Sequence, residues 1–171
     1  MEGIRSRIHG RVQGVGSSMK KKPSILFLSK NNAVRGQMAE AMLRHLAGDR
    51  FEVTSAGIDP QPVPALTQRV LEEAGIEAAP LTSKNVRDFM ARTVVNVAIM
   101  LSDDTPADPR VYPFAPFNVT WRFEDPLSAP GTEEEMLGRF RRLRDSLRER
   151  LQGWLVEQAA REAVLQETAL V

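Results

Sequence analysis

A polar loop of the kind that binds anions follows the first apolar run of the chain. The run Ser24–Ser29 leads into the residues KNNAV and then into Arg35, which opens a helix-like segment. A strand that ends in such a loop before a helix offers backbone N–H groups and a positive helix end to an oxyanion. Arg35 adds a fork suited to phosphate or arsenate, and Asn31 and Asn32 tolerate left-handed backbone angles. We therefore predict an oxyanion site formed by Ser29, Lys30, Asn31, Asn32, Ala33, Val34 and Arg35.

The residue at the start of this loop, Ser29, decides whether the site has a nucleophile. Ser29 stands where a nucleophile would stand, and the chain contains no cysteine, which excludes disulfides, thiolate metal ligands and thiol chemistry within it. A hydroxyl nucleophile needs an adjacent general base. The two histidines, His9 and His45, lie in the N-terminal segment and on the far turn of the predicted helix. We expect the loop to bind an anion with negligible turnover.

Length and charge place the chain among single-domain globular proteins. It has 171 residues, 42% of them hydrophobic and 26% charged, with a formal net charge of +1. Six basic side chains and one acid fall within residues 1–24, so the remainder carries about four net negative charges. Such a balance gives no large field for nucleic acid, and no apolar run reaches the ~20 residues that span a bilayer. We expect a cytoplasmic protein with no cofactor, no metal, and neither nucleic acid nor membrane as partner.

The chain divides into three parts by composition. Residues 1–22 are basic and rich in Gly and Ser, so they are predicted to form a flexible extension. Within it, GRVQGVG at residues 10–16 resembles the start of the acylphosphatase loop, but the catalytic Arg of that family is missing, so the match is interpreted as a chance or vestigial one. Residues 23–158 form the predicted domain. The tail 159–171 is expected to fray.

Strand-like and helix-like segments alternate through the domain. Apolar residues recur at three- and four-residue steps in the predicted helices, and the last helix begins with a capping box at Thr132 and Glu135. Gly48 and Gly75 supply stops for the first two helices. This alternation predicts an α/β fold with an open, largely parallel sheet. The predicted strands are 24–29, 51–57, 93–101 and 118–121, and the predicted helices are 36–47, 64–74, 83–91 and one starting after residue 132.

The segment from Lys22 to Trp154 resembles the low-molecular-weight protein tyrosine phosphatases and, among them, the thioredoxin-coupled arsenate reductases. Those proteins carry Cys, five residues and Arg-Ser after the first strand, where this chain has Ser29, five residues, Arg35 and Gly36. SAG at residues 55–57 and the Asp-Pro pair at Asp125 also match. The resemblance implies an open three-layer sandwich with a four-stranded parallel sheet.

The resemblance also implies roles for three residues, with Ser29 at the nucleophile position, Arg35 binding the anion and Asp125 as general acid. Without the resemblance, Asp125 is equally well explained as a turn initiator before proline. The cysteines that relay oxidising equivalents in the resembling reductases correspond here to Leu101 and Asp108. The thiol in the middle of their loop corresponds to Val34.

Three functions remain open from the sequence. The first is a cysteine-less arsenate reductase-like or phosphatase-like protein, a pseudoenzyme that binds phosphate, arsenate or a phosphorylated ligand without efficient catalysis. The second is an active phosphatase or arsenate-related enzyme that uses Ser29 with Asp125 as general acid. The third is a vestigial loop on a domain that binds a protein partner.

Overall fold

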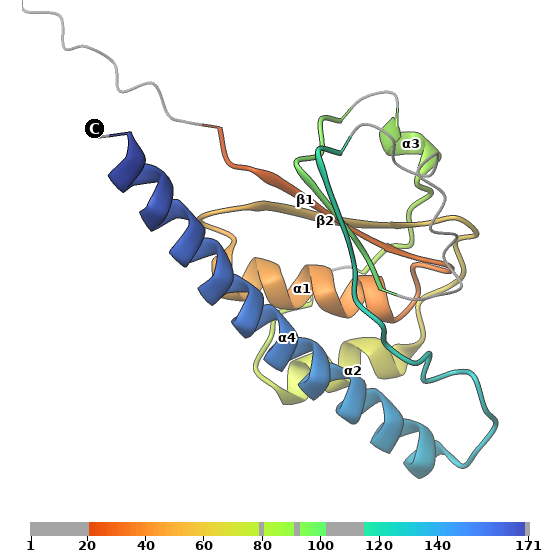
Figure 1. Cartoon of the computed structure of the whole chain (residues 1–171). Helices are drawn as coiled ribbons and strands as arrows, with labels where there is room; N and C mark the ends of the chain where they lie inside the picture. Colours follow the sequence, from red (N-terminus) through yellow and green to blue (C-terminus); the bar gives the residue numbers. More distant parts are fainter. Residues whose placement is uncertain (1–20, 79–80, 91–92, 102–114, 170–171) are drawn as a thin grey trace, which may run out of the picture.

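The computed structural model describes residues 21–78, 81–90, 93–101 and 115–169 (Figure 1). The N-terminal residues 1–20, which include His9 and the GRVQGVG segment, lie outside this part, as do Asp108 and most of the Pro-rich stretch. The elements in chain order are β1 (Ser24–Ser29), α1 (Arg35–Ala47), β2 (Glu52–Gly57), α2 (Ala65–Glu73), α3 (Arg87–Met90), β3 (Val97–Met100), β4 (Phe117–Thr120) and α4 (Glu133–Thr168).

The four strands form one parallel sheet in the order β2-β1-β3-β4. All six residues of β1 are buried, as its uninterrupted apolar run predicts for a central strand of a parallel sheet. Because all strands run the same way, their carboxyl ends share one edge of the sheet. The loop after β1 therefore lies at the edge where open α/β sheets bind ligands.

The sheet is covered unequally on its two faces, which gives the predicted three-layer sandwich. Helices α1, α2 and α4 cover one face, while α3 lies on the other (Figure 1). Phe27 of β1 packs into the larger core with Met42 of α1 and Phe140 of α4. Leu26 and Leu28 point to the opposite face and pack with Val86 near α3. This alternation along β1 anchors the start of the loop on both sides.

The last helix follows its predicted pattern at the start and departs from it at the end. The capping box is present: Thr132 Oγ1 accepts from Glu135 N–H, and the Glu135 carboxylate accepts from Thr132 N–H. α4 continues to Thr168, so residues 159–168 are helical where the sequence predicts a frayed tail. The periodic apolar face on which the helix prediction rests stops at Trp154. Beyond it, Val164 and Leu165 are exposed. The buried side chains of α4 are those at the predicted spacing: Leu137, Phe140, Leu143, Leu147, Leu151 and Trp154.

Two other boundaries show how local contacts set the ends of elements. β3 begins at Val97, four residues later than predicted; just before it, Asn96 Oδ1 accepts the Ser24 N–H and the Val94 carbonyl accepts the Ser24 hydroxyl. Gly75 follows α2 with φ +70°, the left-handed angle for which its glycine is suited. No helix in the described ranges is long and apolar enough to cross a membrane.

Helices α2 and α4 are joined by ion pairs between Glu73 of α2 and arginines of α4. Arg141 donates from Nε and Nη2 to the two oxygens of Glu73, each at 2.8 Å, and Arg144 Nη1 lies 3.6 Å from the same carboxylate. The hydrogen bond from Arg141 is the main cause that lowers the pKa of Glu73, and the charges of Arg141, Arg69 and Arg144 add to it against desolvation. The folded state thus holds Glu73 ionised more readily than the unfolded state does.

We expect Glu73→Gln to lower the free energy of unfolding at pH 7 and to have little effect near pH 3. A depressed carboxyl pKa contributes stability above the unfolded pKa, and this contribution is lost as pH falls through the folded pKa. Urea unfolding of both proteins at pH 7, 5 and 3 measures the difference. Glu72→Gln, at an exposed neighbour that bonds only Gln68, is the matched control. An equal difference at every pH would contradict the assignment.

Candidate functional site

The loop of residues 30–34 joins the carboxyl end of β1 to the amino end of α1, and Ser29 stands at its head. Ser29 is 2% exposed, and its Oγ accepts the N–H of Asn32 at 3.2 Å. The hydroxyl is therefore fixed inside the loop and does not face bulk solvent. Its position is the one that the sequence predicts for a nucleophile.

All five backbone carbonyls of the loop are bonded to groups outside it. Their oxygens consequently turn away from the centre of the loop, which removes negative partial charge from the place where an anion would lie. The Lys30 carbonyl accepts from Ile58 and Asp59 N–H, the Asn31 carbonyl from Gln61 N–H, and the Asn32 carbonyl from Gln37 Nε2 and Ser83 Oγ. The Ala33 carbonyl accepts from Thr67 Oγ1 and the Val34 carbonyl from Met38 N–H. All these distances lie between 2.9 and 3.3 Å.

The N–H groups of the loop have the opposite arrangement. Within the described residues, the N–H groups of Asn31, Ala33 and Val34 donate to no acceptor, although Ala33 and Val34 are about 95% buried (5% and 4% exposed). Val34 is the N-cap of α1 and supplies no side-chain cap. Buried N–H groups are nearly always bonded in native proteins. This set of free donors at a helix amino end is therefore suited to an anion.

Asn32 gives the loop its sharp turn. Its φ is +45°, in the left-handed region that the sequence predicts for this residue type, and its side chain is fully buried. Oδ1 accepts from Gln37 Nε2 and from Lys84 N–H, each at 2.9 Å. Gly57 at the end of β2 allows this close approach, since a Cβ at that position would lie 2.9 Å from Asn32 N and Cβ. The turn is thus held from α1, β2 and the segment before α3.

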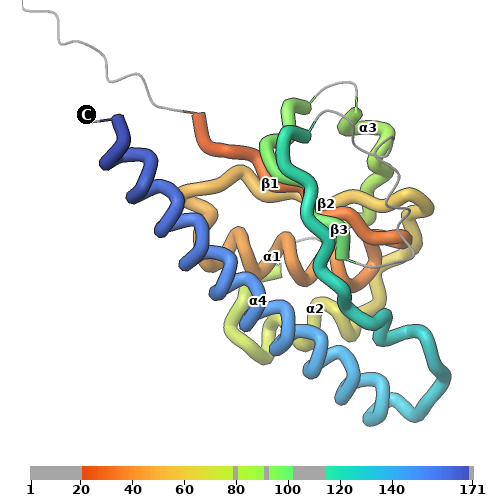
Figure 2. Tube along the Cα trace, in the orientation of Figure 1, coloured from red at the N-terminus to blue at the C-terminus, as the bar shows by residue number. Residues whose placement is uncertain are grey.

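Arg35 contacts Asp125, which lies ninety residues later in the sequence. Arg35 Nη2 lies 3.2 Å from Asp125 Oδ2, and Nη1 donates to the Phe123 carbonyl at 3.1 Å. The segment after β4 reaches this place by passing the amino end of α1 before it turns into α4 (Figure 2). Asp125 is in turn fixed by the N–H of Leu127, which its Oδ1 accepts at 2.9 Å. The guanidinium is 4% exposed while the Asp125 side chain is 26% exposed.

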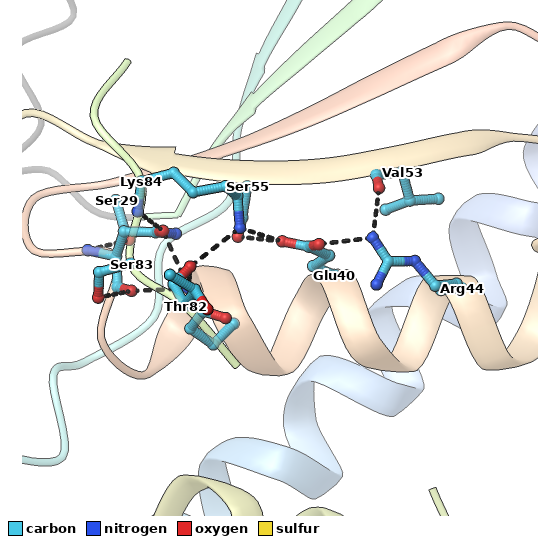
Figure 3. Close-up of polar contacts among 10 residues, drawn as sticks. Ser29, Glu40, Arg44, Val53, Ser55, Thr82, Ser83 and Lys84 are labelled. Carbon is cyan, nitrogen blue, oxygen red and sulfur yellow. Dashed lines mark hydrogen bonds and ion pairs between the residues drawn. The ribbon is translucent and has the colours of Figure 1, made fainter. Parts of the chain in front are cut away.

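A buried carboxylate supports the loop from behind. Glu40 of α1 accepts a hydrogen bond from Ser55 Oγ of β2, and Lys84 Nζ lies 3.1 Å from its Oε2 (Figure 3). Arg44 Nη2 donates to Glu40 Oε1 at 2.6 Å and to the Val53 carbonyl at 2.9 Å. This network ties α1 to the sheet edge and to the segment that contains Lys84. Because Lys84 N–H also holds Asn32, the network and the loop share one support.

The structure brings the three predicted catalytic residues to one place. Ser29 and Arg35 bound the loop, and Asp125 contacts Arg35. Lys30 is exposed and has its carbonyl, not its side chain, bonded within the site. His45 is exposed on the last turn of α1, far along the helix from the loop.

Sequence reasoning missed the residues that support the loop from outside. Gln37 and Glu40 lie within a predicted amphipathic helix, where Glu40 and Arg44 have the spacing typical of a solvent-exposed pair. Glu40 is instead 8% exposed. Ser83 and Lys84 fall within the predicted helix 83–91, but α3 begins only at Arg87, so both residues lie in the connection before it. Ser55 carried a signal only as part of the SAG motif.

The loop combines N–H groups that have no acceptor among the described residues with the buried guanidinium of Arg35 at its end. No histidine of the described part lies beside Ser29. Leu101, at one of the two relay positions, is fully buried in the core. No group of three or more His, Cys, Asp or Glu side chains suited to a metal ion occurs among the described residues.

The fold and the loop define a class of protein. The family described as low molecular weight phosphotyrosine protein phosphatase matches residues 24–167, and the chain belongs to it. Its relatives in this family include arsenate reductases. Those of Halalkalibacterium halodurans and Bacillus subtilis are 35% and 32% identical to it over 133 and 127 residues. The alignments cover 76% and 74% of this chain and 93% and 91% of the relatives.

Solved structures agree with this assignment. An arsenate reductase in the phosphate binding state superposes with a TM-score of 0.67 at 27% identity, covering 79% of this chain and 98% of that one. An arginine phosphatase from Geobacillus stearothermophilus has the same fold, with a TM-score of 0.63 at 23% identity. The chain is thus a member of the phosphatase family and is similar to arsenate reductases. It contains no cysteine.

Proposed function

We propose that this chain binds phosphate or arsenate in the loop 29–36 and does not turn it over efficiently. The observation that carries the proposal is the polarity of residues 30–34: their five carbonyls are bonded to groups outside the loop, while the N–H groups of half-buried Asn31 and of buried Ala33 and Val34 have no acceptor in the described part. A relative at 27% identity was solved in a phosphate binding state. A cytoplasmic location remains a prediction from sequence.

Chemistry at Ser29 is disfavoured by its surroundings. Oγ accepts an N–H from Asn32, and among the described residues no side chain is hydrogen-bonded to this hydroxyl as a general base that could take its proton. The ionisation that a helix end promotes in a thiol, whose pKa starts near ~8.5, is out of reach for a hydroxyl. Binding without turnover is the outcome that these contacts support.

Thermal unfolding in phosphate, arsenate and sulfate tests the binding. A ligand that binds only the folded state raises the melting temperature by an amount that grows with ligand concentration. We expect a rise with phosphate and with arsenate between 0 and 50 mM, compared with sodium chloride at equal ionic strength. No rise with any of these anions would contradict the proposal.

A residual phosphatase is the second candidate, and the contact between Arg35 and Asp125 favours it, because that contact holds a carboxyl group next to the loop. Hydrolysis of p-nitrophenyl phosphate above the buffer background tests it. Ser29→Ala and Asp125→Asn would both abolish such turnover. Turnover that survives both substitutions would assign it to a contaminant.

A further inference from the structure

A second polar recess lies beside the oxyanion site, between the segment after β4 and helix α4. It has a volume of about 380 Å³, and its walls include Phe123 and Asp125 on one side and Arg139, Arg142, Leu143 and Ser146 on the other. Two of these residues also contact the arginine of the loop, since Asp125 pairs with Arg35 Nη2 and the Phe123 carbonyl accepts from Nη1. The recess and the loop therefore share a wall.

The recess is lined by two arginines and two carboxylates, and within the described residues neither carboxylate forms an ion pair with these arginines. Arg139 donates to two neutral groups, the carbonyls of Pro126 and Ala129, at 2.9 and 2.7 Å. Arg142 makes no hydrogen bond or ion pair with any described residue. One carboxylate in the wall, Asp125, is engaged by Arg35, and the other, Glu124, is exposed to solvent.

Helix α4 explains why Arg142 is left unpaired. Residues four positions away on either side, Gly138 and Ser146, carry no charge, and Arg139 one turn earlier is a like charge. Asp145, three positions later, is taken by Arg144 at 2.8 Å. Glu134 and Glu135 lie on an adjoining hollow that both arginines also line, and Glu135 is committed to the capping box.

Arginines on the opposite side of the same helix show the contrast. Arg141 and Arg144 face α2, and both lie within 4 Å of Glu73. The arginines of α4 that face α2 are thus paired with a carboxylate of this chain. Arg139 and Arg142, which face the recess, have no ion pair with a described residue, and a ligand could supply an anion to them.

We propose that this recess holds an acidic side chain of a phosphorylated polypeptide whose phosphate occupies the loop. This inference rests on the proposed oxyanion binding and adds the ligand class: a phosphorylated residue with an Asp or Glu near it. Arg142 and Ser146 can bond a carboxylate, and the apolar sides of Phe123 and Leu143 can cover the methylene groups of a Glu. Inorganic phosphate or arsenate alone would leave the recess empty.

Fluorescence polarisation with two labelled phosphotyrosine peptides tests the proposal on the full chain. One peptide carries glutamates on both sides of the phosphotyrosine, and the other carries alanines at those positions. We expect the wild-type protein to bind the glutamate peptide about tenfold more tightly, the value of one charge-assisted contact. This preference should fall as sodium chloride rises from 50 to 500 mM.

The variants assign the preference to the recess. Arg142→Gln is expected to weaken binding of the glutamate peptide about tenfold and of the alanine peptide less than twofold. Arg161→Gln, at an exposed position on the same helix remote from the recess, should retain the wild-type preference. Equal affinity of wild-type protein for the two peptides, or an unchanged preference in Arg142→Gln, would overturn the inference.

A parallel titration of wild-type protein with inorganic phosphate separates this inference from the proposed function. Phosphate binding without a preference for the glutamate peptide would overturn the recess alone. Absence of binding by phosphate and by both peptides would overturn the oxyanion loop and the recess together.

Discussion

Ser29→Cys is expected to give this protein phosphatase turnover with p-nitrophenyl phosphate on the order of 10³-fold or more above the wild-type background, since loss of a nucleophile costs up to ~10⁶ in a well-studied enzyme. A thiol at residue 29 would lie at the amino end of α1, next to the Asn32 N–H and near Arg35, where a thiolate is stabilised. The wild-type hydroxyl cannot be ionised in the same field. Initial rates at pH 5 to 7 measure the effect.

Controls decide what a gain in Ser29→Cys means. Ser29→Ala should bind phosphate and have no turnover. Adding Asp125→Asn to Ser29→Cys should lower the rate about 10²-fold or more, the usual contribution of a general acid. A correctly folded Ser29→Cys protein that binds phosphate but stays inactive would show that the surrounding geometry no longer supports transfer.

Gly36 is the feature that could limit this gain. The family pattern has serine there, yet a Cβ at residue 36 would lie 2.7 Å from Asn32 Nδ2 and 3.0 Å from Ser29 Oγ. Asn32 Nδ2 is also a buried donor without a partner in the described part. The absence of a side chain at Gly36 thus lets the Asn32 amide lie where a serine would otherwise crowd it. Restoring serine requires Asn32 to move, so Ser29→Cys alone is the cleaner test.

The sheet and most helices could be predicted because each carries a periodic signal of its own. The buried run of β1, the capping box at Thr132 and the apolar spacing of α4 are local patterns, and local patterns are read directly from sequence. The part of α4 after residue 158 has no buried face, so its helical state depends on continuation from the preceding turns. Nothing in its own spacing predicts it.

The residues of the candidate site also differ in whether a local sequence pattern predicts them. Ser29, the loop and Arg35 are contiguous in the sequence, and Asp125 belongs to an Asp-Pro pair that resembles the family pattern. The support of the loop by Lys84, Ser83 and Glu40 is made across the fold between residues more than forty positions apart, and no spacing rule connects them. Such contacts follow from the strand order, in which β2 lies beside β1 and the segment after α2 returns to the loop.

Arg35→Lys is expected to weaken phosphate binding between about tenfold and a hundredfold, with little change in melting temperature in the absence of ligand. Lysine keeps the positive charge beside Asp125 but cannot offer the planar pair of donors, and each lost charge-assisted bond is worth about 1.5–3 kcal/mol. Calorimetric titration with phosphate measures the loss. Lys30→Gln, at an exposed loop residue, serves as the charge control and should bind less than threefold more weakly.

The same arginine explains why affinity is expected to be modest in the wild-type protein. Its Nη2 is already engaged by Asp125, so an oxyanion must share or displace an internal carboxylate that also repels it. Asp125→Asn removes this competing charge and is expected to strengthen phosphate binding several-fold, opposite in direction to Arg35→Lys. Weaker binding in Asp125→Asn, or unchanged binding in Arg35→Lys, would place the anion somewhere other than the loop.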